Sequence, residues 1–213
     1  MLSLLYRKQM REFFPMVFAV FLCLFMLISP VFGYGYKKEE DPLIKVFKAV
    51  VFYGKEENWN QIKYELGTLN DRVKDVNIIF GVDLLPQLME SIEKKDFQSL
   101  IKNMANLVFL AMREKFYWNI TEQLKIYIKA KVRLRLAEEY YVTLLSGNVR
   151  EFDLRNGTNI NDEIFQKFAE THKTLGSLGF FGVGAANPDL KRFVSITNEI
   201  EEKLKTVFRY FKY

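Results

Sequence analysis

The sequence predicts an all-α fold, an antiparallel helical bundle of about five to six helices behind an N-terminal signal peptide or membrane anchor. Apolar residues recur at alternating spacings of three and four along several segments, the pattern of helices packed lengthwise. No segment shows the sustained apolar–polar alternation that indicates a strand. Helix breakers are also few, because the 213 residues include 20 Phe and 11 Tyr but only 11 Gly and 5 Pro.

The N-terminal part, residues 1–36, is predicted to enter a membrane. Residues 13–36 contain no charged side chain and follow a basic stretch with Arg7, Lys8 and Arg11. The basic side chains are expected to stay on the cytoplasmic side while the rest of the chain crosses.

Two interpretations of this segment remain open. Pro30 ends its apolar core, and Val31 and Gly33 place small residues at the −3 and −1 positions of a signal-peptide cleavage site. The uncharged run is also long enough to be retained as a membrane anchor. Either way, residues 37–213 are expected to form an extracytoplasmic domain, in the periplasm or at the cell surface.

The first half of this domain is predicted to hold three helices. Asp41 and Pro42 have the residue types of an N-cap and a first helical position, and they begin a helix over residues 42–54. A single long helix is expected over residues 59–80, and a short one over residues 83–95. The apolar stripe of the long helix is Trp59, Ile62, Leu66, Leu69, Val73 and Val76.

A longer helical stretch follows, which Asp96 is expected to cap and which continues to Leu145. An interruption is predicted at residues 117–119, because the sequence beginning there has the spacing of a capping box. The Ser-Gly-Asn triplet at residues 146–148 is predicted to end the stretch.

Two connections and two helices complete the domain. Residues 149–160 are predicted to form a polar connection with an Asn-Gly turn, and Asn161 to cap the next helix. A glycine-rich loop over residues 176–186 then leads to Asn187 and Pro188, a strong helix start. The final helix is expected to run almost to the C-terminus.

The glycine-rich loop is one candidate site. Two adjacent phenylalanines on a flexible glycine backbone are suited to insertion into a lipid surface or a partner's groove. The alternative is a tight connection between helices whose phenylalanines cover the end of the core. The candidate contact loop consists of Gly179, Phe180, Phe181, Gly182, Val183 and Gly184.

Lys131 and Glu138 form a second candidate site, because they interrupt an apolar stripe at positions where apolar residues are expected. Polar side chains there are costly unless paired, and a buried pair fixes helix register or lines a ligand pocket. The alternative is that the stripe drifts around the helix and leaves Lys131 at its margin, with only its stem buried.

Catalytic and metal signatures are missing from the sequence. The one histidine is His172 and the one cysteine is Cys23, so neither a Cys/His metal cluster nor a covalent haem site can form in residues 37–213. The net charge of +5 comes from basic residues interspersed with acidic ones, which does not indicate nucleic-acid binding.

These observations predict a protein that is not an enzyme and needs no cofactor, and that acts by contact with an unidentified protein partner or a membrane surface. The alternative is a helical bundle that binds a small apolar or anionic ligand in its core, for transport or sensing.

The interpretation as a cleaved signal peptide predicts that the mature chain begins at Tyr34, directly after Gly33. N-terminal sequencing of the protein from its native host measures this. An intact Met1 in the membrane fraction would show that the segment is an anchor.

Overall fold

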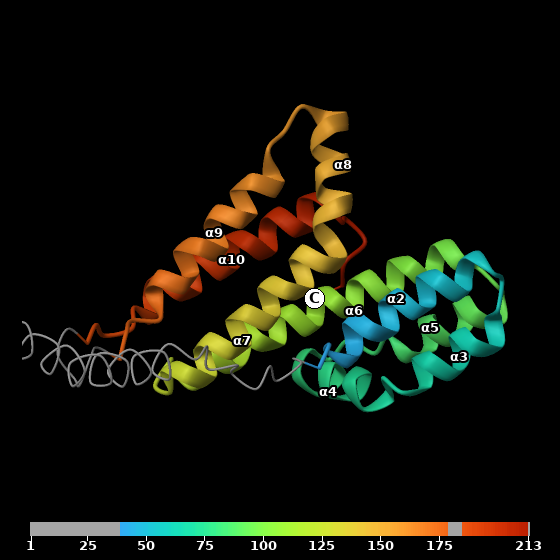
Figure 1. Ribbon diagram of the computed structural model, residues 1–213, viewed down its shortest axis with the longest axis horizontal. Coiled ribbons are helices and arrows are strands. Elements are labelled where there is room, and N and C mark those ends of the chain that lie inside the picture. Colours follow the sequence, from blue (N-terminus) through green and yellow to red (C-terminus); the bar gives the residue numbers. More distant parts are fainter. Residues whose placement is uncertain (1–38, 179–184, 213) are drawn as a thin grey trace, which may run out of the picture. The chain divides into compact units, whose positions relative to one another are not determined.

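The computed structural model describes residues 39–178 and 185–212. Contacts within the chain divide it into two units, Met1–Glu39 and Glu40–Tyr213, and the second holds nearly all of the described residues. The described part is helical apart from its connections and one isolated bridge, so the all-α class is confirmed. Its elements (Figure 1) are α2 (Pro42–Lys55), α3 (Trp59–Gly67), α4 (Asn70–Phe80), α5 (Leu85–Glu93), α6 (Phe97–Thr121), α7 (Tyr127–Tyr140), the π-helical turn η1 (Tyr141–Leu145), α8 (Ser146–Asn156), α9 (Ile160–Thr174) and α10 (Leu190–Val207).

The central element is α6. Every residue from Met104 to Met112 is buried, so this part of the helix is enclosed on all sides. Figure 1 shows α6 between α7 and the group formed by α2, α4 and α5, and α10 also contacts it. The hydrophobic core is therefore arranged around this one helix.

Two predicted helix starts are confirmed. The Asp41 carboxylate accepts a hydrogen bond from the Leu43 amide at 2.9 Å, and Asp96 accepts one from the Ser99 amide at 3.0 Å. Each bond satisfies an amide that has no partner within its own helix.

The single helix predicted over residues 59–80 is wrong, because α3 and α4 are separate helices. The chain turns at Thr68 and Leu69, where the Thr68 hydroxyl donates to the Glu65 carbonyl at 2.6 Å. Such a bond offers the backbone an alternative to continuing the helix. Leu69 is nevertheless buried, so the apolar pattern passes through the break unchanged.

The interruption predicted at residues 117–119 lies too early. Helix α6 continues to Thr121, and the turn comes at Gln123 and Leu124, whose φ angles are 53° and 56°. Asn119 caps no helix; it is fully buried and donates to the Ala130 carbonyl of α7 at 3.0 Å. That bond holds α7 against α6.

The end predicted at residues 146–148 is also wrong. Helix α7 passes through η1 into α8, which continues to Asn156. The polar stretch after Ser146 is the largely exposed surface of α8, not a connection. The Asn-Gly turn is confirmed at Gly157, whose φ of 66° ends the helix in the left-handed conformation.

The predicted caps of the last two helices are replaced by aspartates. The Asp153 carboxylate accepts hydrogen bonds from the Ile160 and Asn161 amides at 2.9 and 2.8 Å. A side chain of α8 therefore provides acceptors for the free amides at the start of α9. The Asn161 side chain instead accepts from the Tyr141 hydroxyl at 2.8 Å. Asp189, not Asn187, caps α10.

The last residues leave α10 and return to the core. The ring of Phe211 stacks on Phe109 of α6 at 4.6 Å between centroids and on Phe208 at 4.7 Å. The Lys212 amide donates to the buried Asn106 side chain at 3.1 Å. This tail explains how α6 tolerates a polar residue within its buried part.

None of the helices in the described part of the chain is both long and apolar enough to cross a membrane. The predicted signal peptide or anchor, residues 1–36, lies outside the described residues.

The core around α6 predicts that Ile200→Ala lowers the free energy of unfolding by about 2–5 kcal/mol, because the side chain is fully buried and its removal leaves a cavity. Ile78→Ala is the matched control, since Ile78 is 81% exposed, and we expect a change within about 0.5 kcal/mol. Urea unfolding followed by circular dichroism measures both. Equal effects of the two changes would contradict the assignment of the core.

Candidate functional site

The predicted contact loop, residues 179–184, lies outside the described residues, but its base is described. Ser177 and Ala186 form an antiparallel bridge with N–O distances of 3.0 and 3.2 Å. Gly176 precedes it with a φ of 75°, and an added Cβ would lie 2.2 Å from the Ala186 carbonyl oxygen. Glycine is therefore required where the loop closes, and Leu178 beside the bridge is exposed.

Lys131 and Glu138 are both half-buried, and each has its own partner. The Lys131 ammonium donates to the Tyr127 hydroxyl at 3.2 Å and lies 5.4 Å from the centre of that ring. A Glu138 oxygen lies 2.9 Å from His172 Nε2, which links α7 to α9. Among the described residues, no hydrogen bond or ion pair joins Lys131 to Glu138.

The outward side of α7 is unusual for a surface helix. Its inward side is formed by Ala130, Leu134 and Ala137, all buried. On the opposite side Ile128 and Val132 are 64% and 59% exposed. The helix therefore has apolar residues on both sides, and the outer ones have no covering element in the described structure.

Basic residues surround these exposed apolar side chains. The stretch from residue 123 to residue 137 contains five Lys or Arg and no Asp or Glu. Arg133 binds Glu122 through two hydrogen bonds of 2.8 and 2.9 Å. In contrast, three exposed basic residues form no ion pair with another described residue. With the two apolar residues they make up the α7 face: Lys125, Ile128, Lys129, Val132 and Arg135.

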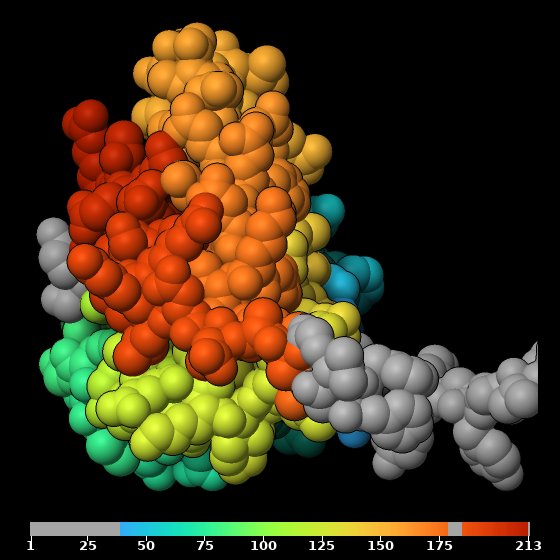
Figure 2. Space-filling view, turned by 90° about the vertical axis from the view of Figure 1, so that its left-hand side faces the viewer, coloured from blue at the N-terminus to red at the C-terminus, as the bar shows by residue number. Residues whose placement is uncertain are grey.

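The start of α7 lies beside the base of the predicted contact loop (Figure 2). Figure 2 shows the start of α7, in yellow-green, directly beside the ends of the α9–α10 connection, in orange. The bond between Glu138 and His172 links α7 to α9 near the C-terminal end of each helix. The sequence contains a signal for the α7 face, a run of basic residues around Ile128 and Val132, but this surface was not predicted.

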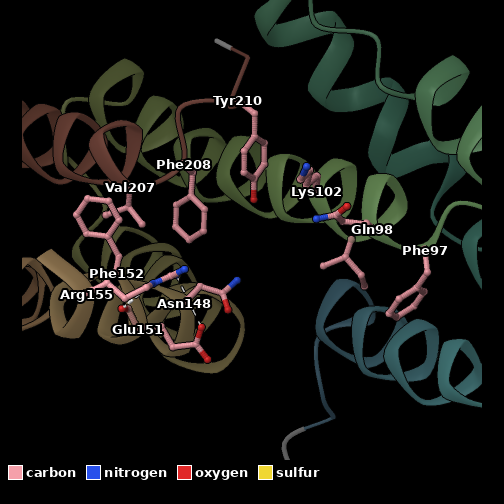
Figure 3. Close-up of a pocket in the computed structure, with 11 residues that line it drawn as sticks. Phe97, Gln98, Lys102, Asn148, Glu151, Phe152, Arg155, Val207, Phe208 and Tyr210 are labelled. Carbon is pink, nitrogen blue, oxygen red and sulfur yellow. Dashed lines mark hydrogen bonds and ion pairs between the residues drawn. The ribbon is translucent and has the colours of Figure 1, made fainter.

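An open groove lies elsewhere, between the start of α6, α8 and the C-terminal tail (Figure 3). Its volume is about 600 Å³. Phe97 reaches it from α6 and lies directly over Gly54 of α2, where no side chain would fit. The other residues that line this α6–α8 groove are Gln98, Ile101, Lys102, Asn148, Glu151, Phe152, Arg155, Val207, Phe208 and Tyr210. Three distant segments form it, so no local sequence pattern could indicate it.

A cluster of buried charges joins α4 to α6. The Glu114 carboxylate contacts the Arg72 guanidinium at 2.6 Å and the Lys115 ammonium at 3.1 Å. Burial, together with the neighbouring charge of Arg72, lowers the pKa of Lys115. Burial likewise raises the pKa of Tyr140, whose hydroxyl accepts a hydrogen bond from Arg72 at 3.4 Å. These groups contact one another and link two helices, which indicates a structural role.

Within residues 39–178 and 185–212, no three Asp, Glu, His or Cys side chains are grouped closely enough to hold a metal ion. Comparison of the chain with models of protein families, with curated proteins and with solved structures found no match. The chemistry of the α7 face and of the α6–α8 groove is therefore the basis for a functional proposal.

Proposed function

We propose that this protein is a non-enzymatic contact protein that binds a membrane surface rich in anionic lipid through the α7 face. The observation that carries the proposal is the placement of two exposed apolar side chains, Ile128 and Val132, among three basic ones that form no ion pair within the described residues.

The chemistry of the α7 face fits the boundary between lipid headgroups and acyl chains. Ile128 and Val132 would be buried at this boundary, while Lys125, Lys129 and Arg135 would lie among the phosphates. Each basic residue near an anionic membrane contributes about 1 kcal/mol of binding free energy. The attraction is electrostatic, so it weakens with salt.

The contact loop belongs to the same proposal. Its base lies beside the start of α7, and Phe180 and Phe181 would add aromatic side chains to the apolar part of the contact. The domain would work as an extracytoplasmic helical bundle, delivered across a membrane by residues 1–36. A retained anchor would raise the local concentration of the α7 face at the bilayer.

Binding to liposomes tests the proposal, with residues 37–213 first checked for folding by circular dichroism. We expect co-sedimentation with vesicles of equal parts phosphatidylcholine and phosphatidylglycerol, but not with phosphatidylcholine alone. The double change Lys125→Gln and Lys129→Gln should weaken binding by about tenfold or more, because two basic residues are lost. Ile128→Ser with Val132→Ser should weaken binding without changing the melting temperature.

The matched controls make the same kinds of substitution at exposed positions outside the α7 face. Lys45 and Lys63 are exposed and form no ion pair with another described residue, so changing both to Gln removes the same charge from other helices. Ile78→Ser is the control for the apolar pair. If these controls weaken binding as much as the α7 variants, net charge and not the α7 face governs association. Crosslinking of the α7 face to an acidic protein in place of lipid would favour the alternative, a protein partner.

A further inference from the structure

The α6–α8 groove combines an apolar floor with a polar rim. Phe208 is buried at its floor, and Phe152 and Val207 beside it are half-buried. Lys102 and Gln98 lie on one side in Figure 3, and the polar side chains of α8 lie on the other. A ligand that matched both parts would need an apolar body and a polar end.

The charges on the rim decide which polar end fits. Glu151 and Arg155 compensate each other: the Arg155 guanidinium donates to the Glu151 carbonyl at 3.2 Å, and their charged groups lie 3.9 Å apart. Lys102 is exposed and forms no ion pair with any other residue in the described part of the chain. Hydrogen bonds from Ser99 and, to a smaller extent, the charge of Lys102 lower the pKa of the Asp96 carboxyl. No ion pair within the described residues engages Lys102, so this positive charge of the rim can pair with one anion.

Tyr210 adds a neutral hydrogen-bond donor. Burial raises the pKa of its hydroxyl to about 12, so the group is protonated at neutral pH. Figure 3 shows this side chain extending towards the helix that carries Lys102. A carboxylate accepts hydrogen bonds from both an ammonium and a hydroxyl, whereas a cationic head group would be repelled by Lys102.

We propose that the α6–α8 groove binds an amphiphile with a single apolar chain and a single carboxylate head group. The apolar chain lies along Phe152, Val207 and Phe208, and the carboxylate pairs with Lys102. The volume of about 600 Å³ lies within the range of small-molecule sites. This site is separate from the α7 face, so either proposal can fail without the other.

Photolabelling of the full chain in lipid nanodiscs tests the inference. The probe is dodecanoic acid with a diazirine at the end of its chain, and labelled peptides are identified by mass spectrometry. We expect labels on residues of the groove floor, removed by an excess of unlabelled dodecanoate but not by dodecanol. Lys102→Glu should lower the labelling about fivefold, because an attraction becomes a repulsion. Asn148→Trp, which fills the groove from α8, should lower it as well.

Lys63→Glu is the matched control, because it makes the same charge change at another exposed position. Its labelling should equal that of the unchanged protein. Labels spread over many helices, equal labelling by the methyl ester of the probe, or labelling of the groove that Lys102→Glu does not lower would each overturn the inference. Because circular dichroism of each variant shows whether it is folded, loss of labelling through unfolding is distinguished from loss of the site.

Discussion

From Met104 to Met112 every side chain of α6 is buried, and the other elements are arranged around this requirement. A helix that is apolar on all sides is stable in water only when neighbours cover it completely. Helices α2, α4, α5, α7 and α10 contact it. The tail completes the cover, because Phe211 stacks on Phe109 and the Lys212 amide satisfies Asn106. The surfaces available for function are therefore those that do not cover the buried part of α6.

The elements that the sequence predicted correctly depend on local chemistry. Asp41 and Asp96 accept hydrogen bonds from amides two or three residues later, so the signal and the interaction lie in the same short segment. Two of the wrong predictions concern helix ends at which the hydrogen-bond partner lies in another helix. Asn119 has a capping sequence but bonds to α7, and Asp153 caps α9 from another helix. The break after α3 was missed because Leu69 keeps the apolar pattern through the turn.

The candidate surfaces likewise depend on contacts between distant residues, which the sequence does not show. The apolar residues of α7 are visible in the sequence, but only the structure shows that Ile128 and Val132 are exposed while Leu134 is buried. The α6–α8 groove joins α6, α8 and the tail, so only the fold brings Lys102 near Tyr210. Glu138 and His172 were considered separately, and the structure joins them at 2.9 Å.

Native-state hydrogen exchange tests most directly whether the fold depends on the enclosure of α6. The amides of residues 107–111 should exchange only through global unfolding, so their exchange free energy should equal the unfolding free energy from urea denaturation. The amides of α3 and α8, whose helices have exposed sides, should exchange through smaller local openings. If residues 107–111 exchanged with a free energy well below that of global unfolding, α6 would open independently, which would contradict its central role.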